Sequence, residues 1–214
     1  MDWSVAFARS PLVAIRRGIT PDAAMTVVGA LLDEGFTRVE VPLNAPNAMD
    51  SLNRPGSRFA KDAVIGAGTV LTPIQVCQIK AAGGRLVVSP NYDARVASAV
   101  LQHGIVDGPG VRTESEASAA LKAGTTSLKL FSAKMFQAAV VKSLRFVLPA
   151  LSVLLPVGSI APVAMVAYAE AGATGFELGS ALCRPSMTPA EAGADAHTFY
   201  LAWSSLQKET QDAT

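Results

Sequence analysis

The feature that most constrains the fold is a junction that recurs along the chain, where a helical segment ends at glycine and an apolar strand follows at once. It occurs five times, as Asp33-Glu34-Gly35-Phe36, Ala82-Gly83-Gly84-Arg85, Gln102-His103-Gly104-Ile105, Lys122-Ala123-Gly124-Thr125 and Glu170-Ala171-Gly172-Ala173. Glycine just past a helix adopts a left-handed conformation that other residues reach only with strain. Helix starts are marked by proline at a likely first position, as in Thr20-Pro21, Thr72-Pro73 and Ala161-Pro162. The chain therefore alternates helices with strands.

Eight apolar segments precede the helices or follow the glycines, and each is short enough for one buried strand. They are Leu12–Ile15, Arg38–Leu43, Ala63–Gly66, Leu86–Ser89, Ile105–Asp107, Ser127–Phe131, Leu151–Val157 and Gly175–Leu178. A final amphipathic helix is expected near Ala190–Lys208. Apolar strands that alternate with helices indicate a parallel sheet covered on both faces. We predict an α/β fold, a single (β/α)8 TIM barrel, with one domain over residues 1–214.

The main alternative is an open, doubly wound sheet. Its usual glycine fingerprint, Gly-x-Gly-x-x-Gly, is missing from the first strand-to-helix turn, which favours the barrel. One unit is weak, because the helix expected near Ala48–Lys61 is interrupted by Asn53-Arg54-Pro55-Gly56.

Composition excludes several classes of function. Half of the 214 residues are hydrophobic and 16% are charged, which is enough for a large core. The net charge of +1 gives no electrostatic field that would attract nucleic acid or an anionic membrane. Cys77 and Cys183 lack metal or redox spacing, which favours reduced thiols in the cytoplasm. The uncharged segment Phe146–Ala169 contains three prolines, so it predicts no membrane span.

Lys129 lies inside the apolar run Ser127-Leu128-Lys129-Leu130-Phe131. A buried lysine is unusual, and loss of hydration lowers its pKa towards neutrality. A neutral amine on a strand is the nucleophile that forms a Schiff base with a carbonyl substrate. The simpler interpretation is a strand-end lysine whose ammonium reaches water.

Alternation along the second strand places Glu40 on the same inner face. Val39, Val41 and Leu43 form the set that faces the helices, so Glu40 points into the barrel with Lys129. Glu40 is then either a counter-ion or a general acid and base whose pKa is raised by burial.

Further candidates follow other strands, at the end of a barrel where active sites lie. Arg17 follows the first strand and could bind a carboxylate, although adjacent arginines are often only solvated. Thr69 follows Gly66-Ala67-Gly68 and offers a hydroxyl. Val157-Gly158-Ser159-Ile160 and Leu178-Gly179-Ser180-Ala181 follow the last two strands, where phosphate-binding barrels present backbone N–H groups. Each glycine could also serve only a tight turn.

These segments, in order, resemble a known family. The motifs are Arg17-Gly18-Ile19-Thr20-Pro21, Val39-Glu40-Val41-Pro42-Leu43-Asn44, Ile65-Gly66-Ala67-Gly68-Thr69-Val70-Leu71, Pro109-Gly110-Val111 and Leu128-Lys129-Leu130-Phe131. The chain is similar to the class I aldolases for 2-keto-3-deoxy-6-phospho sugar acids from about Pro11 to Ser180. The first two motifs resemble the 6-phosphogalactonate branch, whereas the 6-phosphogluconate branch usually has Thr-Leu-Arg after its glutamate.

The resemblance implies roles for the residues found above. Lys129 would form the Schiff base and Glu40 would transfer protons. Substrate would be lined by Arg17, Thr69, Gly158, Ser159, Ile160, Gly179 and Ser180. The chain departs from the family at Ser132, where proline is usual, at Ser159, where glycine is usual, and over Ala133-Lys134-Met135-Phe136-Gln137. These departures affect the expected phosphate site more than the carbon–carbon chemistry.

The implied activity is a lyase that cleaves 2-dehydro-3-deoxy-6-phospho-D-galactonate to pyruvate and D-glyceraldehyde 3-phosphate. No metal or organic cofactor is expected, because an iminium on Lys129 would withdraw the electrons. The family also implies a homotrimer. The alternatives are the 6-phosphogluconate aldolase, a phosphate-barrel isomerase or synthase in which Lys129 only pairs with charge, and a degenerate barrel that binds without catalysis.

Overall fold

The computed structural model describes residues 1–133, 135, 137–184 and 187–212, with backbone only for 209–212. Eight parallel strands form a barrel closed between the first and the last. In chain order they are β1 (Leu12–Ile15), β2 (Arg38–Pro42), β3 (Val64–Gly68), β4 (Leu86–Ser89), β5 (Val106–Val111), β6 (Leu128–Phe131), β7 (Leu154–Val157) and β8 (Phe176–Leu178). The predicted (β/α)8 barrel is confirmed.

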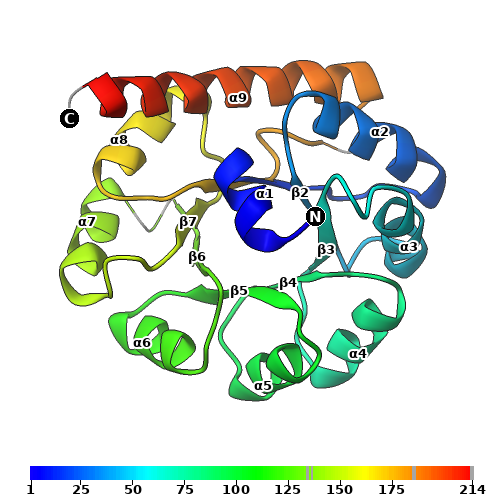
Figure 1. Ribbon diagram of the computed structural model, residues 1–214, viewed down its shortest axis with the longest axis horizontal. Helices are drawn as coiled ribbons and strands as arrows, with labels where there is room; N and C mark the ends of the chain where they lie inside the picture. Colours follow the sequence, from blue (N-terminus) through cyan, green and yellow to red (C-terminus); the bar gives the residue numbers. More distant parts are fainter. Residues whose placement is uncertain (134, 136, 185–186, 213–214) are drawn as a thin grey trace.

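Helices cover the outside of this barrel (Figure 1). They are α1 (Trp3–Arg9), α2 (Pro21–Asp33), α3 (Ala48–Arg58), α4 (Pro73–Ala81), α5 (Ala94–Gln102), α6 (Glu114–Lys122), α7 (Ala138–Val147), the 3₁₀ turn η1 (Pro162–Ala164), α8 (Met165–Glu170) and α9 (Pro189–Asp212). In Figure 1, α1 crosses the centre of the ring, and α9 runs along one side past α8 and α2.

The predicted start and stop signals act as expected. The five junction glycines have positive φ, for example 87° at Gly35 and 85° at Gly124. Thr72 caps α4 in a reciprocal arrangement with Gln75, in which each side chain accepts a hydrogen bond from the other residue's backbone N–H.

Several elements differ from the prediction, and strand β7, for example, begins at Leu154 rather than Leu151. The helix α3 is continuous through Pro55, which is buried in its last turns, so packing overrides the poor helix propensity of Asn53-Arg54-Pro55-Gly56. Strand β5 extends to Val111 rather than Asp107, although it contains Pro109. At Gly110 a Cβ atom would lie 2.2 Å from the Pro90 carbonyl oxygen, so this strand requires glycine for close backbone approach.

Side chains that point outward from the strands form the main core under the helices, and those that point inward fill the barrel. The inner set at the amino-terminal end is apolar and includes Val13, Val64 and Leu86, with Trp3 and Phe7 of α1 packed against it. The short helix α1, which was not predicted, thus closes this end of the barrel.

One cationic side chain, that of Arg38, lies among the apolar residues that close the amino-terminal end of the barrel. Arg38 is completely buried, and its guanidinium lies 4.7 Å from the ring centroid of Trp3 and 4.6 Å from that of Phe7. Arg38 Nη2 donates a hydrogen bond to the Ser10 carbonyl oxygen at 2.7 Å. Burial lowers the pKa of Arg38 to about 9.

Among the helices that the structure describes, none is long and apolar enough to cross a membrane.

Candidate active site

Lys129 points into the barrel from the middle of β6. Leu128 and Leu130 on either side belong to the outer core, which leaves Lys129 on the inner face as predicted. Its ammonium nitrogen lies 3.8 Å from Glu40 Oε1, so the structure brings together the two residues proposed for catalysis. The same nitrogen lies 5.8 Å from the ring centroid of Phe131.

Glu40 occupies a space that only a glycine on the neighbouring strand leaves open. A Cβ atom added at Gly68 would lie 2.2 Å from Glu40 Oε2 and 2.9 Å from Oε1. Glu40 Oε2 has no hydrogen-bond partner among the described residues, so this oxygen can accept a proton from a molecule bound beside it. Burial raises the pKa of Glu40 to about 7, against the opposing effect of Lys129. This value agrees with the expected acid and base role.

A second carboxylate contacts Lys129 and was missed from the sequence. Glu177 Oε2, on β8, lies 3.0 Å from Lys129 Nζ, closer than Glu40. Glu177 is 1% exposed, and a Cβ atom at Gly108 would lie 3.5 Å from its Oε1. Burial raises the pKa of Glu177, while Lys129 and Arg38 act in the opposite direction. The missed signal was a charge within the apolar strand Phe176-Glu177-Leu178, the same signal that identified Lys129.

Because of Glu177, the expectation that Lys129 has a lowered pKa is wrong. Burial does lower the pKa of Lys129, but the carboxylates of Glu177 and Glu40 together raise it more, and the net shift is upward. The two neighbouring carboxylates therefore favour the ammonium form of Lys129 over the neutral amine. The described residues contain no group of three or more His, Cys, Asp or Glu side chains suited to a metal ion.

A pocket of about 350 Å³ lies at the carboxyl ends of β1, β6, β7 and β8. Its lining residues are Ile15, Arg17, Phe131, Ser132, Val157, Gly158, Ser159, Gly179 and Ser180. Five of the predicted substrate residues, Arg17, Gly158, Ser159, Gly179 and Ser180, are therefore gathered in one pocket. Arg17 also acts electrostatically on both Glu40 and Lys129, which links this pocket to the charged cluster.

The other two predicted substrate residues lie elsewhere. Ile160 is buried in the outer hydrophobic core and does not line the pocket. Thr69 is half-buried at the end of β3, beyond Gly68, and is not part of the pocket lining. Its φ of 59° is unusual for a β-branched residue.

The expected phosphate turn has a left-handed conformation at both central residues. The φ angles are 124° at Gly158 and 53° at Ser159, so the serine occupies a conformation that favours glycine. A Cβ atom at Gly158 would lie 2.9 Å from Ser132 Oγ, so the two departures from the family pattern are close in space. Lys134 and Phe136, in the segment after β6, lie outside the described residues.

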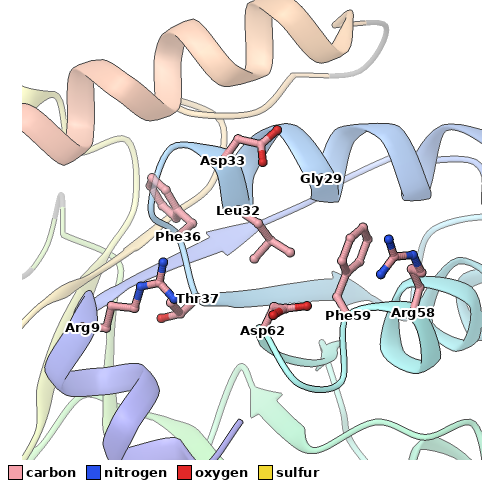
Figure 2. Close-up of a pocket in the computed structure, with 9 residues that line it drawn as sticks. All are labelled: Arg9, Gly29, Leu32, Asp33, Phe36, Thr37, Arg58, Phe59 and Asp62. Carbon is pink, nitrogen blue, oxygen red and sulfur yellow. The ribbon is translucent and has the colours of Figure 1, made fainter.

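A second pocket, of about 260 Å³, lies between the end of α1, the end of α2 and the end of α3 (Figure 2). It is lined by Arg9, Gly29, Leu32, Asp33, Phe36, Thr37, Arg58, Phe59 and Asp62. These residues precede the strands, so the pocket is at the amino-terminal end of the barrel, away from Lys129. Active sites of such barrels lie at the other end, which favours the Lys129 cluster as the candidate catalytic site.

The fold and the cluster together define a class: a (β/α)8 barrel with a buried lysine beside two buried carboxylates, next to glycine-containing turns that line a pocket. Comparison with known proteins then identifies the family. Residues 6–194 match the family model for KDPG and KHG aldolase, and the chain belongs to this aldolase family.

Two relatives and one solved structure agree with one another. The 2-dehydro-3-deoxy-6-phosphogalactonate aldolase of Escherichia coli (strain K12) is 37% identical over 203 residues, covering 95% of this chain and 98% of the relative. A probable aldolase of the same name from Rhizobium meliloti (strain 1021) is 42% identical over 178 residues, covering 83% and 84%. A solved structure described as native KDPGal has a TM-score of 0.91 and 37% identity, covering 92% of this chain and 96% of its own. The predicted resemblance is confirmed.

Proposed function

We propose that this protein cleaves 2-dehydro-3-deoxy-6-phospho-D-galactonate to pyruvate and D-glyceraldehyde 3-phosphate through a Schiff base on Lys129. The observation that carries the proposal is the buried amine of Lys129, which lies 3.8 Å from Glu40 and next to a pocket of substrate size. The choice of the galactonate substrate is supported by the names of the two relatives that cover most of the chain.

The residues suggest how the reaction proceeds. Neutral Lys129 attacks the C2 ketone, and loss of water from the carbinolamine gives an iminium that withdraws electrons from C3. Glu40, whose pKa of about 7 suits proton transfer in both directions, takes the C4 hydroxyl proton as the C3–C4 bond breaks. Protonation of the resulting enamine and hydrolysis of the iminium release pyruvate.

The remaining pocket would bind the polar ends of the substrate. Arg17 would pair with the substrate's anionic groups, and the turns at Gly158-Ser159 and Gly179-Ser180 would offer backbone N–H groups to the phosphate. Thr69 and Ile160 were expected to line the substrate as well. Thr69 would contact the substrate through its hydroxyl at the end of β3, whereas the burial of Ile160 favours a role in shaping the turn.

Borohydride reduction in the presence of pyruvate tests the proposal directly. The reduced pyruvyl adduct should be found on Lys129 by peptide mass spectrometry, and Lys129→Met should fold and form none. A Lys129→Met protein that still gains the adduct would move the nucleophile to another lysine, such as Lys134. A wild-type protein that gains none would favour the isomerase or the binding-only alternative.

The substrate epimer is tested separately. The C4 epimers, the 6-phosphogalactonate and 6-phosphogluconate derivatives, would be compared by kcat/KM in one assay of pyruvate release. We expect the galactonate derivative to be preferred. The second candidate, the gluconate activity, is favoured if the order is reversed.

We also propose that the enzyme works as a homotrimer in the cytoplasm. An exposed apolar set on the α7–β7 and η1 segments supports self-association, with Phe146 81%, Leu151 95% and Val163 84% exposed. Both cysteines are free, which suits a reducing compartment. Light scattering coupled to size exclusion should give three times the chain mass, and Leu151→Glu should reduce it.

A further inference from the structure

The two carboxylates beside Lys129 occupy different positions in the barrel. Glu40 pairs in register with Ile15, which lines the substrate pocket. Glu177 pairs in register with Val13 on β1 and with Val157, which also lines the pocket, on β7. The two carboxylates therefore reach Lys129 from different strands, with Glu40 Oε2 beside Gly68 at the end of β3 and Glu177 Oε1 beside Gly108 within β5.

This arrangement raises a question about the first step of the proposed reaction. Lys129 can attack a ketone only after it loses a proton, because an ammonium has no free electron pair. The Lys129 side chain is 9% exposed, so bulk water has little access to it. Glu177, at 3.0 Å, is the closer of the two carboxylates, and Glu40 is needed for protons on the substrate.

We propose that Glu177 is a second catalytic carboxylate, which accepts the proton of Lys129 before attack and returns it after product release. The inference depends on the proposed function, since it concerns activation of the Schiff-base lysine. In the transfer an Nζ–H bond breaks, its electron pair stays on nitrogen, and an O–H bond forms on Glu177 Oε2. The pair has the same net charge before and after, so no buried charge is created.

The surroundings of the pair suit this exchange. Burial raises the pKa of Glu177, so this carboxylate holds a proton more readily than an exposed glutamate does. Three other charged groups act on the pair, namely Glu40 and Arg38 from β2 and Arg17 after β1. The flanking positions on β5 and β7 are uncharged: Gly110 and Leu155 are the partners of Lys129, and Gly108 lies beside Glu177.

A different role for Glu177 must be separated from this one. Arg38 is a buried cation that acts on Glu177, so Glu177 could serve only to balance its charge. Replacing Glu177 alone would then destabilise the fold by leaving Arg38 uncompensated. The effect of replacing Glu177 should therefore be measured in a protein in which uncharged methionine already replaces Arg38.

The experiment compares Arg38→Met with the double variant Arg38→Met, Glu177→Gln, which differ only in the carboxylate. The rate of borohydride trapping with pyruvate is measured from about pH 7.5 to pH 9, above the pKa of Glu40, and circular dichroism verifies the fold. We expect a nearly level rate in wild type and in Arg38→Met, because the proton moves within the pair. In the double variant Glu40 still favours the ammonium form of Lys129, which must now lose its proton to solvent, so the rate should fall about 10²-fold at pH 7.5 and rise about tenfold per pH unit. A double variant that is faster than Arg38→Met would show that Glu177 only raises the pKa of Lys129, and would overturn the proposal.

Equal rates and pH profiles in the two variants would overturn the proposal and leave Glu177 as a counter-ion. If the double variant does not fold, the pH profile of the wild-type rate still decides. A wild-type rate that rises about tenfold per pH unit would show that Lys129 loses its proton to solvent, and this result would also overturn the proposal. Absence of any adduct on Lys129 in wild type would instead reject the proposed function itself, which distinguishes the two failures.

Discussion

The position of Gly68 gives a sharp test of the active-site geometry. In Gly68→Ala the new methyl group would lie 2.2 Å from Glu40 Oε2, so the carboxylate must retreat by about 1 Å to reach ordinary contact. A displacement of 1 Å at a reacting group can cost about 10²-fold in rate. We therefore expect kcat for cleavage to fall about 10²-fold, which corresponds to about 2.7 kcal/mol in the barrier.

The effect on stability should be smaller than the effect on catalysis. Overpacking of a filled interior costs about 1–3 kcal/mol, so Gly68→Ala should remain folded with a Tm lowered by several degrees. The assay is pyruvate release coupled to NADH oxidation by lactate dehydrogenase, with Tm measured on the same samples.

Gly29→Ala is the matched control, because it adds the same methyl group inside α2, where the nearest heavy atom, in the ring of Phe59, is 3.8 Å away. It should keep kcat and raise the free energy of unfolding by up to about 1 kcal/mol. The reasoning is refuted if Gly68→Ala is folded and its kcat stays within about twofold of wild type.

Three further predictions concern the same end of the barrel. Glu40→Gln should lower turnover by about 10²–10⁴-fold with little change in substrate affinity, and an unchanged turnover would make Glu40 merely structural. In wild type, turnover should fall as the pH drops through about 7, the pKa of Glu40, because a protonated carboxyl cannot accept the C4 hydroxyl proton. A pH–rate profile that is level across this range would contradict the role assigned to Glu40. Ser159→Gly should raise the free energy of unfolding by roughly 0.5–1 kcal/mol, because relief of the left-handed φ of 53° exceeds the added chain entropy. Both wild type and this variant should prefer the phosphorylated substrate to its dephosphorylated analogue, and equal kcat/KM on the two would remove the phosphate from the proposal.

Most of the fold could be predicted because its signals are local. A glycine past each helix and an apolar run after it are readable without tertiary information, and alternation alone placed Glu40 and Lys129 on one inner face. The continuity of α3 through Pro55 could not be read in this way, because burial of that turn depends on elements that are distant in sequence. The same holds for β5, where Pro109 and its flanking glycines resemble a turn until the approach of Pro90 is known.

The electrostatics of the site could be predicted only in part. Burial of Glu40 and its raised pKa followed from the apolar residues around it. The direction of the Lys129 shift did not, because it depends on Glu177, which comes from a strand 48 positions later and meets Lys129 only when the barrel closes. The placement of Ile160 in the outer core likewise depends on how the turn after β7 is seated.

The packing of α1 has a practical consequence for anyone who sets out to alter this enzyme. The rings of Trp3 and Phe7 hold the guanidinium of Arg38, and Arg38 acts on Glu177, which contacts Lys129. Substitutions in the first helix should therefore alter the electrostatic environment of the Lys129 amine from the far end of the barrel. A mutant library confined to the residues that line the pocket would not sample this control, so directed evolution of the activity should include positions 3, 7 and 38.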